Sequence, residues 1–374
     1  MKVLLVSPLP PPVGGIASWT ENIINYYSLK EYNNPNISIV NLNTALKYRN
    51  VTKISLFSRI FYGLLDGFRS VLIFLFFLIK NKPNVIHMSS SGSLGLIKDI
   101  VFILISKIFK IPFIIHFHFG RIPEISNLNN WEWKLLHKIV SLSSSSIVLD
   151  QHSLDRLISY GFDKVVLIPN PISRSLEMAL DSKGSDIDND EYYRIIFVGH
   201  IIPNKGVYEL IESFCLLDGV NELFLVGPVE QDVKDKIYEL AGNKINSINF
   251  LGVLNKNQVI HEIKSSDLLV LPSYTEGFPN VILEAMAMKC PIVASNVGAI
   301  PSMLNHNLPN PAGLIIEPKN IQDLYKSIQY LKNNKDEATF YANNAFLKVK
   351  NEFVLDNVCA KYEKIWINSV NGDM

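Results

Sequence analysis

Two glutamates in the second half of the chain stand eight positions apart, where an apolar run gives way to a helical pattern. Glu276 lies in the loop after residues 268–273, and Glu284 lies about one turn inside a helix that we expect from about Asn280 to Lys289. A carboxylate can accept two hydroxyl hydrogen bonds, which suits the diol of a ribose or a hexose. The alternative is that Glu284 is only a favourable acid in the first turns of a helix.

The backbone between these carboxylates favours a bound anion. Gly277 permits a tight approach to a ligand. Pro279 suits a first helical turn, because its missing N–H would have no partner there. Free amides at the start of the helix, near residues 278–281, would point toward the anion. The two carboxylates would therefore flank one site of the size of a phosphate.

A second loop follows the apolar run at residues 2–7 and carries Gly14 and Gly15 just before a helix expected at residues 17–27. Adjacent glycines let the backbone approach a ligand closely, and a helix start favours a phosphate or another anion. A plain tight turn explains the two glycines equally well. The pattern is not G-x-G-x-x-G, which counts against a dinucleotide fold and against a nicotinamide-dependent oxidoreductase.

Short apolar runs alternate with longer helical patterns along the chain, as βαβ units require. Runs this apolar are typical of strands that are buried on both faces of a parallel sheet. The expected strands cover residues 2–7, 37–42, 85–88, 113–118, 146–150, 165–170, 194–199, 222–227, 248–252, 268–273 and 291–295. We therefore predict an α/β protein with two Rossmann-like, doubly wound domains, whose ligands bind beyond the carboxyl ends of the strands.

The size of the chain also indicates two domains. With 374 residues, 48% hydrophobic and 19% charged, it exceeds what one hydrophobic core usually supports. We place the domains at residues 1–180 and 181–355, with a closing helix at 356–374 that packs back toward the first domain. The polar, acidic stretch at 181–190 is expected to be an exposed linker.

The formal charge of zero hides an asymmetry between the two halves. Residues 1–180 contain 18 Lys and Arg against 10 Asp and Glu, whereas residues 181–374 contain 17 against 25. The basic half is a candidate for contact with an anionic membrane, and a chance distribution over solvated faces is the alternative. A nucleic-acid partner lacks support, because the acidic half has no stripe of basic and aromatic residues.

Residues 53–82 combine basic and large apolar side chains, as a helix at a membrane interface does. Core-facing helices explain residues 71–79 slightly better. That uncharged run is too short to cross a bilayer, which needs about 20 residues, and the first residues resemble a strand rather than a secretory signal. We therefore expect no transmembrane helix. The three cysteines fit neither a disulfide framework nor a zinc cluster, so we expect the protein to be in the reducing cytoplasm.

The segment E-G-F-P-N-V-I-L-E from Glu276 to Glu284 resembles the E-x7-E signature of retaining glycosyltransferases of the GT-B fold, glycosyltransferase family 4, group 1. The segment at 198–206 resembles the family's V-G-R-x-x-x-x-K-G pattern, with His200 where the family usually has arginine. Residues 249–253 resemble the stretch whose backbone holds the nucleobase. The resemblance runs from Lys2 to about residue 370 and is strongest in the second half.

The resemblance implies a role for each matching residue. Lys205, with His200 beside it, would stabilise the leaving diphosphate, Glu276 would hold hydroxyls of the donor sugar, and Glu284 would hold the ribose. His118 would contact the transferred sugar, with His116 as its competitor on the same strand face and a purely structural histidine as the alternative. The implied catalytic residues are His118, Glu276 and Lys205. The implied donor site also contains Gly15, Val253, Gly277, Phe278, Pro279 and Asn280, and the acceptor side consists of Gly14, Gly15 and His118.

The resemblance further implies transfer of a hexose-type sugar with retained anomeric configuration from a UDP- or GDP-sugar, without an essential metal or other cofactor. The implied acceptor is a glycan. Contact of residues 53–82 with the anionic inner face of the plasma membrane would fit a lipid-linked oligosaccharide in the synthesis of bacterial O-antigen lipopolysaccharide, capsule or exopolysaccharide. The alternative is a catalytically impaired module that binds sugar nucleotides, in which His200 and Pro171 depart from the family pattern.

Overall fold

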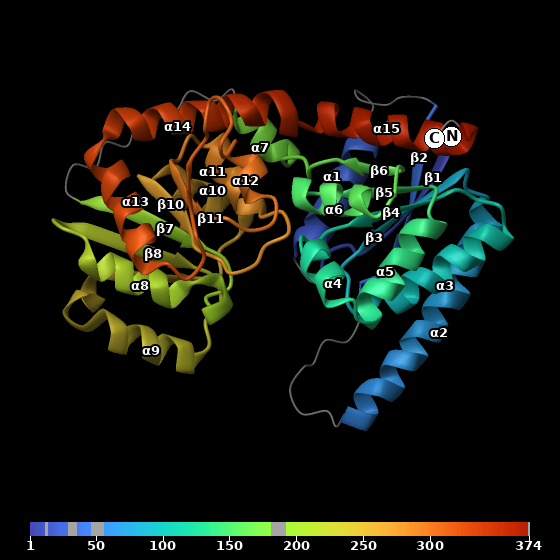
Figure 1. Cartoon of the computed structure of the whole chain (residues 1–374), viewed down its shortest axis with the longest axis horizontal. Coiled ribbons are helices and arrows are strands. Elements are labelled where there is room, and N and C mark those ends of the chain that lie inside the picture. The colour runs from blue at the N-terminus through green and yellow to red at the C-terminus, as the bar shows by residue number, and fades with distance from the viewer. Residues whose placement is uncertain (12–13, 29–35, 46–55, 181–191, 373–374) are drawn as a thin grey trace. The chain divides into compact units, whose positions relative to one another are not determined.

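The structure, a computed structural model, describes residues 1–11, 14–28, 36–45, 56–180 and 192–372, and at 56–66 and 68 it describes the backbone alone. The chain forms two compact units (Figure 1). Unit 1 comprises Met1–Pro171 and Leu355–Met374, and unit 2 comprises Ile172–Val354. The first boundary lies at 171/172 where the sequence suggested 180/181, because helix α7 (Arg174–Ala179) contacts α11 (Asn280–Ala287) within unit 2. The expected linker at 181–190 lies outside the described residues.

Unit 1 contains six parallel strands in the order β2-β1-β3-β4-β5-β6. These strands are β1 (Lys2–Ser7), β2 (Ser38–Asn43), β3 (Val85–Ser90), β4 (Phe113–Phe117), β5 (Ser145–Val148) and β6 (Val165–Leu167). The helices of this unit are α1 (Gly15–Ser28), α2 (Leu56–Asn81), α3 (Gly95–Ile108), α4 (Ile122–Leu128), α5 (Trp131–Leu142), α6 (Gln151–Ser159) and α15 (Leu355–Asn371).

The strands of unit 1 send alternate side chains into two cores, one on each face of the sheet. Val3 and Leu5 of β1 pack in a cluster with α1 and α15. Leu4 and Val6 pack on the opposite face, in a cluster that includes side chains of α2, α3 and α5. Successive side chains of a strand point to opposite faces of the sheet. Residues of the neighbouring strand β3 that are paired with Val3 or Leu5 therefore also lie on the face covered by α1 and α15, even where they are polar.

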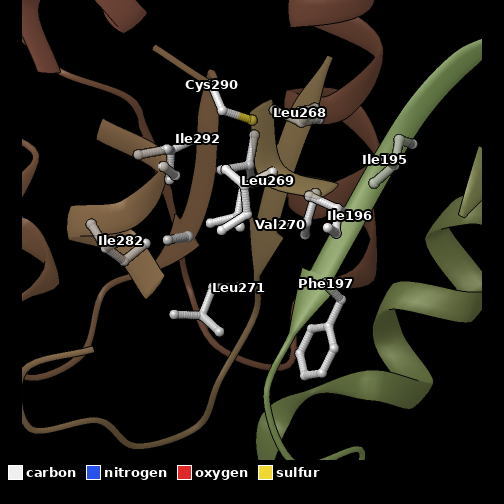
Figure 2. Close-up of a cluster of buried hydrophobic side chains, with 14 of the residues drawn as sticks. Ile195, Ile196, Phe197, Leu268, Leu269, Val270, Leu271, Ile282, Cys290 and Ile292 are labelled. Atoms are coloured by element: carbon white, nitrogen blue, oxygen red, sulfur yellow. The ribbon is translucent and has the colours of Figure 1, made fainter. Parts of the chain in front are cut away.

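Unit 2 contains a second parallel sheet, in the order β12-β11-β10-β7-β8-β9. Its strands are β7 (Tyr193–Val198), β8 (Asn221–Val226), β9 (Ile248–Gly252), β10 (Leu268–Leu271), β11 (Ile292–Ser295) and β12 (Leu314–Ile316). Its helices are α7 (Arg174–Ala179), α8 (Val207–Leu216), α9 (Gln231–Ala241), α10 (Lys256–Lys264), α11 (Asn280–Ala287), α12 (Ile300–Met303), α13 (Ile321–Asn333) and α14 (Lys335–Lys348), with 3₁₀ turns at Pro203–Lys205 and Gly242–Ser247 and a π turn at Val349–Phe353. Figure 2 shows how side chains of β7, β10 and α11 gather in its core, among them Ile196, Val270 and Ile282.

The prediction of two doubly wound α/β domains is confirmed, and each expected strand is present with ends that shift by a few residues. Strand β12 was not expected, because its three residues are too short a run to stand out as a strand. In the part of the chain that the structure describes, no helix is long and apolar enough to cross a membrane.

The order of the strands reverses next to the first strand of each sheet. In unit 1, β1 lies between β2 and β3, and in unit 2, β7 lies between β8 and β10. Loops that leave the two strands at such a reversal run in opposite directions, and ligands of open parallel sheets bind in the crevice between them. In unit 2 these are the loops after β7 and β10, which carry Lys205 and Glu276.

These two loops are pressed together at Gly206. Its φ of +68° is in the left-handed region, and a Cβ added there would lie 2.1 Å from the carbonyl oxygen of Pro272. Gly252 has nearly the same φ, +67°, but a Cβ there would meet no heavy atom within 4 Å. A comparison of substitutions at Gly206 and Gly252 therefore distinguishes the cost of left-handed backbone strain from the cost of steric crowding.

We predict that Gly206→Ala lowers the free energy of unfolding by about 1–3 kcal/mol more than Gly252→Ala, because only Gly206→Ala adds overpacking to left-handed strain. Urea unfolding of both variants and of the parent chain checks this. Equal losses in the two variants would mean that the loop after β7 is not held against the end of β10.

Candidate functional site

The loops after β7 and β10 form one hydrogen-bonded unit at the strand-order reversal of unit 2. Lys205 ends a 3₁₀ turn that starts at Pro203, and Gly206 follows it as the left-handed residue before α8. The amide of Tyr274 donates to the carbonyl of Asn204 at 3.0 Å. The two loops are thus held together by their backbones as well as by their side chains.

The side chains of Lys205 and Glu276 meet between these loops. The Nζ of Lys205 donates to Oε1 of Glu276 at 2.6 Å, and the hydroxyl of Ser273 donates to the same oxygen at 2.7 Å. Among the described residues the other carboxylate oxygen, Oε2, accepts no hydrogen bond. Glu276 is 11% and Lys205 27% exposed in the side chain, so the pair is largely enclosed but can still be reached from solvent.

The loop from Glu276 to α11 is held from the far side by a third segment. The amide of Ala299 donates to the carbonyl of Gly277 at 2.9 Å. A Cβ on Gly298, which has a φ of +55°, would lie 2.2 Å from the carbonyl oxygen of Glu276. Helix α11 then starts at Asn280, after Pro279, and no side chain of the described residues caps its first amides. These amides are the donors that the sequence predicted for an anion.

Glu284 lies on the second turn of α11, with its side chain half-buried. Burial raises the pKa of its carboxyl to about 7, and the nearby positive charge of Lys256 acts in the opposite direction. Among the described residues no hydrogen bond reaches the carboxyl of Glu284. Its two oxygens therefore have capacity for hydroxyl donors of a ligand.

The remaining predicted donor residues differ in what they offer. His200 and Val253 are exposed after the ends of β7 and β9. Gly227 lies between the residues that precede them. Its amide donates to the carbonyl of Gly252 at 2.8 Å, and a Cβ added to it would lie 1.9 Å from the carbonyl oxygen of Gly199. The ring of Phe278 packs against that of Phe353 at a centroid distance of 6.0 Å and is partly buried against the core.

The predicted acceptor-side glycines lie at the start of α1 in unit 1. Gly15 is the first residue of α1, and the amide of Ser18 donates to the carbonyl of Gly14 at 2.9 Å. A Cβ added at either glycine would have no described atom within 4 Å. The backbone near them is therefore accessible, and neither glycine has a positive φ.

His118 is half-buried and lies against a group of buried aromatic residues under α1. Its ring lies 4.0 Å from that of His116 and 4.8 Å from that of Trp19, centroid to centroid. Burial, reinforced by His87, lowers the pKa of His118 to about 3, and burial lowers the pKa of His116 well below its usual range. Both rings are therefore neutral at physiological pH. The Nε2 atom of each is buried and has no hydrogen-bond partner among the described residues.

Sequence reasoning missed Ser273, Gly298 and His87, which hold the predicted residues in place. Ser273 could have been found, because it is the residue at which the expected strand 268–273 ends. His87 could also have been found, because strand alternation places it on the same face as Val85. Gly298 carries no local signal, since its role depends on a contact with a segment more than 20 residues away. The described residues contain no group of three or more His, Cys, Asp or Glu that could hold a metal ion.

We predict that Glu284→Gln stabilises unit 2 at pH 8 but not at pH 5. The folded chain holds the proton of Glu284 up to about pH 7, whereas an ordinary glutamate loses it near 4.5. Between these values the folded state binds more protons than the unfolded state, so this carboxyl lowers stability as the pH rises, by about 1–3 kcal/mol.

Thermal unfolding of Glu284→Gln at both pH values checks this prediction, with a rise in Tm of a few degrees expected at pH 8. The exposed Glu239→Gln serves as the control and should leave Tm unchanged. The same shift in Tm at pH 5 and pH 8 for Glu284→Gln would contradict a raised pKa.

Comparison with known proteins agrees with this arrangement. Residues 181–348 match the model of the family described as glycosyl transferases group 1. The chain is 25% identical over 289 residues to the putative teichuronic acid biosynthesis glycosyltransferase TuaC of Bacillus subtilis, which covers 72% of this chain and 67% of that protein. It is 23% identical over 324 residues to the capsular polysaccharide biosynthesis glycosyltransferase CapM of Staphylococcus aureus. This match covers 81% of this chain and 82% of CapM.

Among solved structures, the fold matches that of HepE from Anabaena in complex with UDP. The TM-score is 0.71 at 18% sequence identity, and the match covers 97% of this chain and 99% of the other. The chain therefore has the GT-B fold and is a glycosyltransferase, and its residues 181–348 match the group 1 glycosyl transferases.

Proposed function

We propose that the chain is a retaining glycosyltransferase that moves a hexose-type sugar from a nucleotide diphosphate, a UDP-sugar in the first instance and a GDP-sugar in the second, to a glycan acceptor. The observation that carries the proposal is the Lys205–Glu276–Ser273 arrangement at the strand-order reversal, beside the uncapped start of α11. The preference for uridine rests on HepE, a structural neighbour that holds UDP.

In this proposal the charge of the leaving diphosphate is stabilised by groups already in position. The ammonium of Lys205 and the first amides of α11 would face the phosphates as negative charge develops, which is the most effective electrostatic contribution to a transfer reaction. Oε2 of Glu276 would accept donor-sugar hydroxyls, and Glu284 would accept those of the ribose. His118 would contact the transferred sugar, and the acceptor would enter along Gly14 and Gly15.

No essential metal or other cofactor is proposed, because Lys205 and the helix amides supply the positive potential that a cation would otherwise provide. Transfer should therefore persist in EDTA. A loss of transfer in EDTA that added Mg²⁺ restores would contradict this part of the proposal.

We predict that Lys205→Ala and Glu276→Ala each lower the rate of transfer at saturating donor by about 100-fold or more, since each removes a group aimed at the reacting donor. Ser273→Ala should cost less, because Lys205 still holds Glu276. UDP release with and without acceptor measures the rates, and thermal unfolding shows whether the fold is retained.

Lys236→Ala is the matched control, because Lys236 forms an exposed ion pair with Glu239 in the same unit. Near-normal turnover in Lys205→Ala or Glu276→Ala would overturn the assignment of this donor site. Binding of UDP without donor hydrolysis or transfer by the parent chain would instead favour the catalytically impaired module, with the exposed His200 as the residue that departs from the family pattern.

The proposed acceptor is a lipid-linked oligosaccharide of bacterial surface polysaccharide synthesis, met at the cytoplasmic face of the plasma membrane. TuaC and CapM are named for the synthesis of such polymers. On this chain, support comes from helices α2 and α3 of unit 1. These helices pack together through Phe74 and Phe102, whose rings stack with a centroid distance of 4.2 Å.

The outward side of these helices, called here the α2–α3 surface, carries exposed large apolar side chains next to exposed basic ones. Phe76 is 59%, Ile79 63% and Ile108 78% exposed. The apolar members are Leu72, Ile73, Phe76, Ile79, Ile97, Leu104, Ile108 and Phe109, and the basic members are Arg69, Lys80, Lys82, Lys107 and Lys110. This mixture suits the interface of an anionic bilayer.

The run at 71–79 has a side for each of its two predicted uses, because Phe74 and Leu78 are buried in the core while Phe76 and Ile79 are exposed. The first part of the segment predicted for membrane contact lies outside this description, since residues 53–55 are not described and the side chains of 56–66 and 68 are not described either.

We predict that the chain floats with liposomes that contain anionic lipid and much less with neutral ones, and that Phe76→Ser combined with Ile108→Ser lowers the floated fraction several-fold. Flotation at low and high salt separates the charge from the apolar contribution. Phe340→Ser, which alters a residue exposed to 47% in unit 2, is the control. A parent chain that stays in the bottom fraction with anionic lipid would overturn the membrane proposal while leaving the donor site untouched.

A further inference from the structure

Three histidines lie on the same face of the sheet in unit 1, where neighbouring strands bring them together. His87 of β3 follows Val85 on that face, and His116 of β4 follows Ile114. His118 comes two residues after His116. α1 contributes Trp19 to this group, and α15 contributes Tyr362 and Trp366. The histidines are thus enclosed by residues from both ends of the chain.

Two hydrogen bonds connect α15 to His116 through His87. The indole Nε1 of Trp366 donates to Nδ1 of His87 at 3.1 Å. Nε2 of His87 lies 3.3 Å from Nδ1 of His116. All three side chains are fully buried, so water does not compete for these groups.

The direction of this chain follows from the chemistry of its first member. An indole nitrogen can only donate, so Nδ1 of His87 must be the acceptor and a neutral His87 must carry its proton on Nε2. That proton is then donated to Nδ1 of His116, so His116 in turn carries its proton on Nε2. One donor on α15 thereby determines the tautomer of two imidazole rings.

His118 depends on this result because its ring lies on that of His116. The centroids are 4.0 Å apart and the planes are inclined by 35°. Trp19 closes the group from α1, at 5.1 Å from His116 and 4.8 Å from His118. A His116 that turned its ring to satisfy another tautomer would displace the surface against which His118 rests.

We propose that Trp366, His87 and His116 are positioning residues that fix His116 as its Nε2–H tautomer and so hold the imidazole of His118 in place, which makes α15 part of the substrate side of unit 1. The proposal rests on the proposed role of His118 in transfer. None of the three is assigned to contact the substrate. Their effect passes through His118 alone.

The groups around the histidines keep all three rings uncharged. Burial lowers the pKa of His87 to about 3. The ionisable side chains that face the rings are the histidines themselves and, from α15, Tyr362, whose own pKa is raised by burial and by Cys359. No carboxylate contributes to the pKa values of the histidines. The tautomers, rather than the charges, are therefore what α15 controls.

The tautomers can be observed directly in the full chain labelled with ¹⁵N in histidine and tryptophan. Long-range ¹H–¹⁵N spectra distinguish Nδ1 from Nε2, and signals are assigned with His87→Asn and His116→Asn. We expect protonated Nε2 and unprotonated Nδ1 at both His87 and His116. A proton on Nδ1 of either ring would overturn the proposal, and this readout does not depend on any enzymatic activity.

A double-mutant cycle tests the connection to His118. Trp366→Phe keeps the aromatic ring but removes the donor, and we expect it to lower kcat of transfer about 10-fold with the KM for the donor nucleotide unchanged. In a His118→Ala background the same substitution should change kcat less than 2-fold. Trp133→Phe, at a buried tryptophan in the other core of unit 1, should leave kcat unchanged.

An equal loss from Trp366→Phe in both backgrounds, or no loss with His118 present, would overturn the positioning role. If the parent chain performs no transfer, the proposed function fails, but the tautomer spectra still test the hydrogen-bonded chain. The two failures are therefore distinguishable.

Discussion

The reversal of strand order beside the first strand of each sheet is the constraint on which the rest of the molecule depends. At every other position the loops that leave neighbouring strands turn to the same face of the sheet and crowd one another. At the reversal in unit 2, the loop after β7 and the loop after β10 contact each other, and the side chains of Lys205 and Glu276 meet between them. The residues with the strongest sequence signal thus lie at the position in the sheet where open parallel sheets bind their ligands.

The sequence predicted the strands of the sheets, and the loop and helix that carry Glu276 and Glu284, because both are encoded locally. Apolar runs between turn residues located the strands, and Glu276 to Glu284 lies on one short loop and the helix that follows it. The support of that loop could not be predicted, since the contact of Gly298 with Glu276 and that of Gly206 with Pro272 join segments distant in sequence. His118 was identified from a resemblance, but its connection through His87 to Trp366 required the register of two strands and the position of a helix from the other end of the chain.

Both candidate sites bury ionisable side chains in their neutral form. Burial costs a charged group far more than a neutral one, and the pKa moves until the neutral form prevails. His116 and His118 remain uncharged, and Glu284 titrates near neutral pH instead of in acid. Buried polar atoms without partners, such as Nε2 of His118, also lower stability. Sites of this kind retain unfavourable groups where a ligand can later satisfy them.

Helix α15 belongs to unit 1, although its residues are the last part of that unit to be synthesised. The core on one face of the first sheet contains Leu355, Tyr362 and Trp366 together with Val3 and Ile114. A ribosome releases the whole of unit 2 before these residues emerge, so unit 2 can complete its fold while α1 packs on that face of the first sheet without α15. The nascent chain therefore exposes the apolar surface that α15 covers, beside the histidines, until the residues of α15 have left the ribosome.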